Sequence, residues 1–356
     1  MGIVHSKIYK HHHNDHKTKR EKSDLKLRRT RSDNILKYKD LSVQDNQGIG
    51  GDARFPSLHG SSGATDGSIG SIQPKSIIGR EFKAHGNPKY MLPGDDEELD
   101  RLLIQHYTVR GTSEPPLILG SKRASKSSTL GMYKTYICGP GSWTLEMATD
   151  YPNSLFIGTD VAEVYPSAIT PRNCEFVKAN TLTGLPFADG TFDYVYQRCM
   201  LLSFPEKDWP TVIKELTRVT KPGGFVEIVE CDLLIHDAGP LTAEWNKKLF
   251  GAMMTRGIDF TLAQRMHGML RSEKSLTNPK KLYYSAPMDW GDAEFGRLGE
   301  LLRQNMEMAF RSLKPMLVLA GAYEETEYDD NTNRALREFA EYKSWVNFFA
   351  YWGQKV

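Results

Sequence analysis

Cysteine is scarce in this sequence, and long apolar runs are missing. The 356 residues include four cysteines, and no two of them form a C-x-x-C pair. This scarcity argues against a disulfide framework or a cysteine zinc site, and it indicates a reducing compartment. No apolar run reaches the ~18 residues that a membrane-spanning helix requires, and the first residues lack the apolar core of a secretory signal. We therefore expect a chain that is at most attached to a membrane surface.

Net charge is small, but it is unevenly distributed. The formal charge is +2 at pH 7, and residues 1–40 contain 12 Lys and Arg against 5 Asp and Glu. The remainder contains 34 basic and 39 acidic residues. A basic tail therefore precedes a mildly acidic body. Because this body is not basic, we do not expect it to bind nucleic acid.

The N-terminal region is predicted to be a disordered tail. Residues 1–79 are first basic and then rich in Gly and Ser, with too few large apolar side chains to offset chain entropy. Order should begin near Ile78. The first residues, "MGIVHSK", match the pattern for N-myristoylation of Gly2, and the basic tail could supply the second membrane signal. The segments "KTKREK" and "KLRRTR" could equally be a nuclear address. Cytoplasm, the cytosolic face of a membrane and the nucleus therefore all stay open, and no metal site is expected.

A helix is predicted over about 95–108, followed by an α/β region. Asp95 can cap this helix, with Glu98 three residues later as in a capping box. Leu99, Leu102, Leu103 and His106 then fall on one face. Strands are predicted at 133–138, 154–160, 174–179, 192–197 and 224–231, and helices at 142–150 and 208–219. This alternation predicts a mostly parallel sheet with helices on both faces. Residues 240–356 should be mostly helical, with strand-like "KLYYSAPMDW" and a closing aromatic run, "WVNFFAYWG".

A glycine turn and an aspartate lie where a nucleoside cofactor would bind. Gly139 and Gly141 connect the first predicted strand of the α/β region to its helix, where free N–H groups favour a ligand. Asp160 ends the next strand about 20 residues later, as an acidic group that holds ribose hydroxyls does. NAD, FAD and S-adenosylmethionine sites share this pattern. Thr144 stands where a dinucleotide site needs a third glycine, which disfavours a nicotinamide oxidoreductase.

Further motifs carry a family resemblance. The segments "FVKANTLTGLPFADGTFDYVYQRC" and "VTKPGGFVEIVE" resemble motifs of class I S-adenosylmethionine-dependent methyltransferases. "KYMLPGDDEELDRLLIQHY" and "MATDYPNSLFIGTD" resemble a fungal branch of that family that includes regulators of secondary metabolism. The resemblance covers nearly all of 88–356. It implies a Rossmann-like domain with a seven-stranded, mostly parallel sheet, an N-terminal lid helix bearing Gln105 and His106, and a helical C-terminal cap.

The same resemblance implies how the cofactor would bind. Gly139 and Gly141 would line its methionine part, and Asp160 would hold the ribose with Val161 beside the adenine. Asn180 and Thr181 stand where the family usually has an acidic residue that meets the adenine amino group, and the Asn180 carbonyl could still accept that bond. Gln197 would lie next to the reacting methyl group. Each also has a simpler structural interpretation, as a strand-end cap, a turn residue or a core side chain.

Two residues depart from the family pattern. Thr135 occupies the usual acidic position of the first loop, and Ile137, which is bulky and β-branched, occupies the usual first glycine. Divergence that weakens cofactor binding would explain them, and so would an error in the coding sequence. The first function hypothesis is methyl transfer to a small organic acceptor. The second is a methyltransferase fold without activity that serves as a partner-binding or membrane-associated scaffold.

No catalytic residue follows from the sequence. Methyl transfer from a sulfonium is a direct displacement, so alignment and exclusion of water are the main tasks of the protein. A base is needed only where the acceptor carries a proton that must leave. His106 and His236 are more typical of structural histidines than of bases. The sequence also does not give the acceptor or the oligomeric state.

Overall fold

The computed structural model describes residues 75–82, 92–112, 132–136, 139–166, 168, 170–291 and 296–356. The predicted lipid site at Gly2, most of the predicted tail and the departure at Ile137 lie outside these residues. In this part of the chain, no helix combines the length and the apolar character that crossing a membrane requires. The described residues also hold no group of three or more His, Cys, Asp or Glu side chains placed to bind a metal ion.

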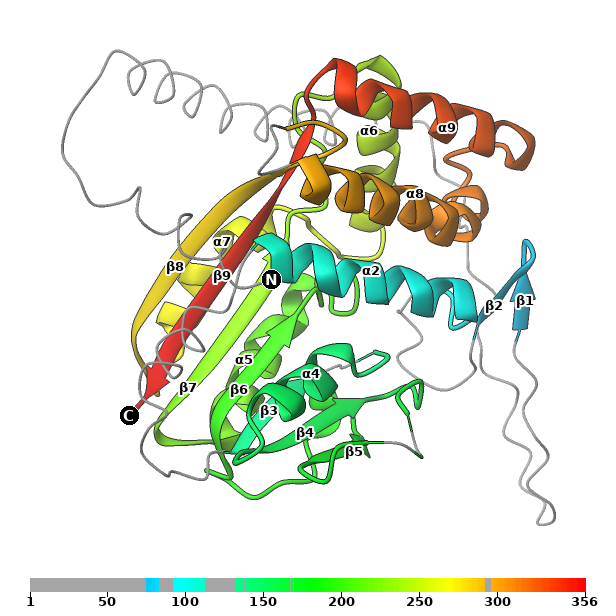
Figure 1. The fold of residues 1–356 in the computed structure, drawn as a ribbon. Coiled ribbons are helices and arrows are strands. Elements are labelled where there is room, and N and C mark those ends of the chain that lie inside the picture. Colours follow the sequence, from blue (N-terminus) through cyan, green and yellow to red (C-terminus); the bar gives the residue numbers. More distant parts are fainter. Residues whose placement is uncertain are drawn as a thin grey trace, which may run out of the picture. The chain divides into compact units, whose positions relative to one another are not determined.

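A seven-stranded sheet forms the centre of the described structure (Figure 1). The strands are β1 (Lys75–Ile77), β2 (Arg80–Phe82), β3 (Met132–Tyr136), β4 (Leu155–Asp160), β5 (Cys174–Lys178), β6 (Phe192–Arg198), β7 (Thr220–Cys231), β8 (Leu276–Pro287) and β9 (Trp345–Lys355). The large sheet has the order β5-β4-β3-β6-β7-β9-β8, and β1 pairs with β2 separately. Strands β3 to β7 are parallel, whereas β9 is antiparallel to both β7 and β8. The predicted fold class is confirmed.

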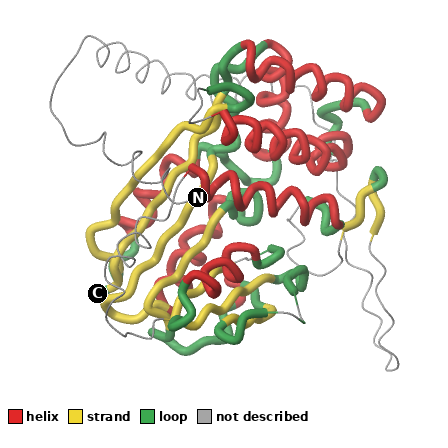
Figure 2. The backbone as a smooth tube through the Cα atoms, viewed as in Figure 1, coloured by secondary structure: helices red, strands yellow, loops and turns green. Residues whose placement is uncertain are grey.

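Helices cover both faces of this sheet (Figure 2). They are α2 (Asp96–Thr112), α4 (Ser142–Asp150), α5 (Trp209–Val219), α6 (Pro240–Met254), α7 (Leu262–Ser272), α8 (Gly296–Leu319) and α9 (Glu325–Glu341), with short 3-10 helices η3 (Thr181–Thr183) and η4 (Glu206–Asp208). On one face, Trp143 of α4 stacks on Tyr196 of β6, with ring centroids 4.6 Å apart. Tyr351 points to the other face, where its hydroxyl donates to the Ala263 carbonyl of α7 at 2.6 Å.

The apolar pattern of the sequence explains the core. Val212, Ile213, Leu216 and Val219 recur at helical spacing, and each is at most 1% exposed. The aromatic run that closes the chain forms β9, an inner strand of the sheet, and most of its rings are buried. These rings therefore belong to the core.

Helices α6, α8 and α9 form a cap beside the carboxyl ends of the parallel strands, and α2 runs across these ends (Figure 1). Aromatic contacts join the cap helices: Phe310 of α8 contacts Trp245 of α6 and Phe339 of α9. This cap and α2 are the parts of the protein that can enclose a ligand at the carboxyl edge of the sheet.

The lid helix α2 starts where it was predicted, and its buried face matches the predicted one in part. Asp95 accepts the Glu98 N–H at 3.1 Å, so the predicted cap is confirmed. Leu103 was expected inside and is 41% exposed. His106 is buried as predicted, and Leu99 and Leu102 are half-buried. The polar residues Glu98 and Arg101 are also buried, at most 5% exposed. Polar contacts of α2 with α8, α4 and β6, described below, explain their burial.

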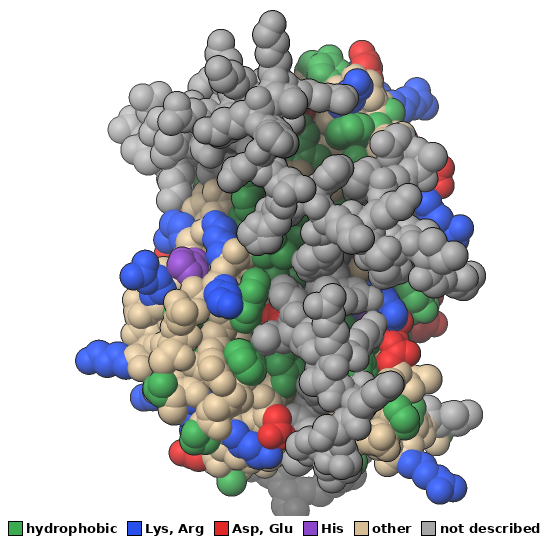
Figure 3. All heavy atoms as spheres, turned by 60° about the vertical axis from the view of Figure 1, so that its left-hand side comes forward, with side chains coloured by type: hydrophobic (Ala, Val, Ile, Leu, Met, Phe, Trp, Pro, Cys, Tyr) green, Lys and Arg blue, Asp and Glu red, His purple; other side chains and the backbone are tan. Residues whose placement is uncertain are grey.

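The β8 edge of the large sheet is basic. Arg271 and Lys274, at and just after the end of α7, and Lys280 and Lys281 of β8 are all exposed, and several Lys and Arg side chains appear on this face in Figure 3. Charged side chains on an edge strand disfavour pairing with another chain, because that pairing would bring like charges together and desolvate them.

Candidate functional site

The glycine turn follows β3, the strand at which the chain reverses its direction across the sheet. From β3 the chain builds β4 and β5 on one side, and then it returns to β6 on the other side. Open α/β sheets bind ligands at such a switch point, outside the carboxyl ends of the strands. Gly139 and Gly141 have φ values of 49° and 77°. A Cβ on Gly141 would also lie 2.6 Å from the Phe176 ring of β5, so only glycine suits this position.

Asp160 reaches from the end of β4 to the glycine turn. Its Oδ2 accepts the Gly139 N–H at 2.9 Å, and its Oδ1 accepts the Ala162 N–H at 2.9 Å. Asp160 is buried, with 7% of its surface exposed. Burial raises the pKa of Asp160 to about 6, although these N–H groups and that of Val161 act in the opposite direction. The structure thus brings together Gly139, Asp160 and Val161 of the predicted set.

Asn180 and Thr181 lie at the end of the neighbouring strand β5. The Asn180 Oδ1 accepts the Leu182 N–H at 3.0 Å and caps η3. This is the local turn role that the sequence also allowed, and it uses one of two lone pairs of the carbonyl oxygen. Thr181 is 1% exposed. Like Asp160 of β4, both residues lie at the carboxyl end of their strand, and β5 is two strands away from β3.

Gln197, at the end of β6, has a buried amide without a partner. It is 0% exposed, and neither its Oε1 nor its Nε2 has a hydrogen-bond partner in the described structure. Its neighbour across the sheet is Tyr136 of β3, which lies just before the glycine turn. A buried amide without hydrogen bonds costs about 1–3 kcal/mol. A polar ligand that binds here could therefore supply the hydrogen bonds that the Gln197 amide lacks.

The lid helix closes over this edge through His106. The Nδ1 of His106 lies 2.9 Å from the Arg198 guanidinium of β6, and its Nε2 lies 3.0 Å from Glu146 of α4. Arg110 of α2 also pairs with Glu146. Burial and the two guanidinium groups lower the pKa of His106 to about 3. His106 is therefore neutral, and both of its ring nitrogens have partners in the described structure.

A second set of buried contacts joins the lid to the cap. Glu98 and Arg101 form a bidentate pair on α2, and their side chains are 2% and 5% exposed. From α8, the Ser312 hydroxyl donates to Glu98 at 2.6 Å, and the Asn305 amide donates to the Arg101 carbonyl at 3.1 Å. Sequence reasoning missed these groups. The i, i+3 spacing of opposite charges was the only signal for the pair, and it is usual on exposed helices as well.

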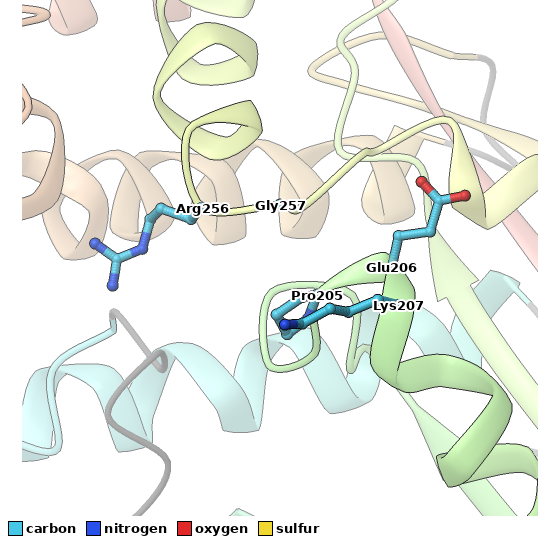
Figure 4. Close-up of a pocket in the computed structure, with 5 residues that line it drawn as sticks. All are labelled: Pro205, Glu206, Lys207, Arg256 and Gly257. Carbon is cyan, nitrogen blue, oxygen red and sulfur yellow. The ribbon is translucent and has the colours of Figure 1, made fainter.

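An open cavity of about 550 Å³ lies between the segment before α5 and the turn after α6 (Figure 4). Its lining consists of Pro205, Glu206, Lys207, Arg256 and Gly257. Glu206 pairs with Arg265 at 2.8 Å, and Lys207 and Arg256 are the basic side chains of the lining. None of the predicted cofactor residues lines it. This cavity is therefore separate from the groups at the ends of β3, β4 and β5.

Comparison with known proteins identifies the family. The model of the methyltransferase domain family matches residues 136–224, which run from the end of β3 into β7. The secondary metabolism regulator laeA of Coprinopsis cinerea is 30% identical over 292 residues, which cover 76% of this chain and 70% of that protein. The chain belongs to the LaeA-like branch of the class I S-adenosylmethionine-dependent methyltransferases.

Two further LaeA-like relatives match over shorter lengths. The protein-methionine methyltransferase laeA of Emericella nidulans is 30% identical over 156 residues, which are 43% of this chain and 40% of that protein. The N-methyltransferase verN of Clonostachys rogersoniana is 32% identical over 151 residues, 40% of this chain and 50% of that protein. The chain matches half or less of the length of these two relatives.

S-adenosylmethionine is the cofactor of LaeA-like methyltransferases, and the residues at the sheet edge fit it. The cofactor carries two ribose hydroxyls that can donate to a carboxylate, and Asp160 presents one beside the glycine turn. It also carries an ammonium and a carboxylate at its methionine end. The orphaned Gln197 amide can accept from the first and donate to the second.

Proposed function

We propose that this LaeA-like methyltransferase transfers the methyl group of S-adenosylmethionine to a small organic acceptor. The main support is the hydrogen bond between Asp160 and the glycine turn. The Asp160 carboxylate accepts the Gly139 N–H at 2.9 Å, at the switch point of the sheet. A site of this layout holds a nucleoside by its ribose and leaves the other end of the cofactor free to react.

Each residue of the predicted set then has a task. Asp160 accepts the ribose hydroxyls, and Val161 lies along the adenine ring. Gly139 and Gly141 let the backbone approach the methionine part. Asn180 and Thr181 face the adenine amino group, and Gln197 binds near the methyl group. The support for these assignments is the placement of all seven residues at the carboxyl edge of β3, β4, β5 and β6.

The bound cofactor supplies an activated methyl group, and the protein aligns and shields the reaction. The lid helix is anchored to both sides of this edge: His106 lies 2.9 Å from Arg198 of β6, and Ser312 of α8 donates to Glu98 at 2.6 Å. An acceptor held between α2 and the cap would therefore react away from bulk water. Alignment of the acceptor with the methyl carbon would supply most of the rate increase.

The charge of the chain supports a small acceptor. Beyond residue 40 there are 34 basic and 39 acidic residues, so the body has no net positive field to attract nucleic acid. One relative is named as a protein-methionine methyltransferase and another as an N-methyltransferase. A protein acceptor and an inactive scaffold are therefore the alternatives that the experiment must separate.

Cofactor binding is the first test. The full-length chain would be titrated with S-adenosylhomocysteine and S-adenosylmethionine while thermal unfolding is followed. Ligand at ~100 times its dissociation constant adds ~2.7 kcal/mol of stability. Asp160→Asn should lose most of this shift. The control Asp193→Asn should keep it, because Asp193 is half-exposed at the start of β6 and pairs with Lys221. A folded wild-type protein without any shift would favour the scaffold.

Attachment to the cytosolic face of a membrane is a separate proposal. Its support is the sequence pattern at Gly2 together with the basic residues of the tail. Cytoplasmic and nuclear positions are the other outcomes of its test, which compares the location of the wild type with that of Gly2→Ala.

A further inference from the structure

A polar cluster lies where β7 leaves the sheet for the cap. It consists of Asp232, His236, Ser285 and Asn347, and we call it the His236 cluster. The His236 Nε2 lies 2.8 Å from Asp232 Oδ2. The Asn347 amide donates to the same Oδ2 at 3.1 Å, and the Ser285 hydroxyl donates to Asn347 Oδ1 at 2.7 Å. Asp232 is 0% exposed and His236 is 9% exposed.

The His236 Nε2 lies 2.8 Å from both the Asp232 Oδ2 and the Asn347 amide nitrogen. A carboxylate is the stronger acceptor, so we assign the Nε2 proton to the bond with Asp232, which leaves the lone pair on Nδ1. No described residue bonds to Nδ1. The Trp345 ring stacks on the imidazole with centroids 5.5 Å apart and holds its plane. This arrangement differs from that of His106, in which partners engage both nitrogens.

The backbone around His236 is strained in a way that holds this orientation. Leu233 and Asp237 both have left-handed φ values, 54° and 45°, although neither is glycine. A left-handed φ is uncommon for leucine and needs support from the surrounding structure, whereas aspartate adopts it more readily. Backbone bonds between His236 and Trp345 in both directions, at 2.8 and 3.2 Å, supply that support.

The cluster lies at the same edge of the sheet as the cofactor residues. Asp232 follows the last residue of β7, and β7 is the parallel neighbour of β6, whose end carries Gln197. The segment after His236 leads directly into α6 of the cap. His236 therefore stands on the side of Gln197 that faces away from β4 and Asp160, between the sheet and the cap.

We propose that His236 is the base that removes a proton from the acceptor, with Asp232 and Asn347 as positioning residues. This inference rests on the proposed function and names its substrate class. A lone pair of an acceptor oxygen or nitrogen forms the bond to the methyl carbon. The carbon–sulfur bond breaks, its electron pair stays on sulfur, and the acceptor proton passes to His236 Nδ1. The acceptor is thus a hydroxyl or N–H compound, because a thioether has no proton to lose.

The test uses the full-length chain, S-adenosylmethionine labelled in its methyl group, and three sets of probes: small phenols, small amines and N-acetylmethionine esters. Transfer to a phenol or an amine is expected. His236→Gln should lower kcat by about 10²- to 10⁴-fold without changing the Kd for S-adenosylhomocysteine. Free imidazole should restore part of the rate to His236→Ala, which a purely structural role would not allow. His267→Gln is the matched control, because His267 also stacks on an aromatic ring but bonds to the Pro279 carbonyl.

Wild-type kcat in His236→Gln, or transfer to the thioether probes alone, would overturn the proposal. A second measurement does not depend on the choice of probes. Diethyl pyrocarbonate should modify His236 but not His106 in the folded protein, as read by mass spectrometry, and an unmodified His236 would equally overturn it. Failure of the proposed function itself appears differently, as the absence of any binding of S-adenosylhomocysteine by the wild type.

Discussion

Asp160 should make cofactor binding depend on pH between pH 5 and pH 7. Burial raises its pKa to about 6, and only the ionised carboxylate can accept both ribose hydroxyls. Lowering the pH from 7 to 5 converts most of the free protein to the protonated form. The Kd for S-adenosylhomocysteine should therefore rise about tenfold over this range, which corresponds to about 1.4 kcal/mol of binding free energy.

Three buried neighbouring groups should not contribute to this change. The pKa of His106 is about 3, so it stays neutral between pH 5 and 7. Burial raises the pKa values of Glu227 and Glu230 to about 8, so both stay mostly protonated. The α-amino group of the ligand titrates near 8 or above, so its charge is also constant.

Calorimetric titration of the full-length chain at pH 5, 6 and 7 measures this effect. Asp160→Asn should bind more weakly at pH 7, by about 1.5–3 kcal/mol for each charged hydrogen bond lost, and its Kd should not change with pH. Asp193→Asn, the half-exposed control, should follow the wild type. An equal Kd at all three pH values in the wild type, or a pH dependence that survives in Asp160→Asn, would refute the reasoning.

Three further predictions concern stability and location. Burial raises the folded-state pKa of Glu227 to about 8, so the stabilisation from its protonated form is complete below pH ~4.5 and is lost as the pH rises through about 8. In the wild type this group makes the free energy of unfolding decrease between pH 5 and 7, and in Glu227→Gln that decrease should be smaller by up to about 1.4 kcal/mol per pH unit. Urea denaturation measures it, and an equal decrease in both proteins would contradict the prediction. Arg101→Met removes the ion-pair partner of buried Glu98 and should lower the free energy of unfolding by about 3–5 kcal/mol in the same assay. Lys178→Met, which removes an exposed ion pair, is the control and should lower it by at most about 1 kcal/mol. Equal losses in the two variants would show that burial does not strengthen the Arg101 pair. Gly2→Ala should move a membrane-bound fraction to the soluble fraction on flotation, and an unchanged distribution would exclude the lipid anchor.

Local sequence patterns were sufficient for most of the sheet and failed where distant segments meet. Alternating apolar runs placed β4 and β5 within one residue at each end. Strand β7 begins at Thr220, four residues before its predicted start, because "PGG" is typical of a turn. There the strand continues through Gly223 at φ 81°, with a register shift opposite β6. The sequence could not reveal that the strand passes through this kink.

The same limit applies to the site. The glycine turn and Asp160 were predictable because about 20 residues and one helix separate them in every such unit. The His236 cluster was not, because Asp232 and Asn347 are 115 positions apart and meet only through the pairing of β7 with β9. The role of Glu98 was also misread, since its cap position in α2 hid its contact with Ser312 in α8.

The attachment of α2 to two different parts of the protein has a consequence for how such an enzyme can diversify. Contacts from Ser312 and Asn305 tie the lid to the cap, and His106 ties it to the strand beside the cofactor residues. A substitution in α8 that admits a larger acceptor will therefore also change how long the cofactor remains bound. We expect selection for new acceptors to proceed through paired changes, one in α8 and one on the buried face of α2. Isolated changes in the cap alone should be rare among active descendants.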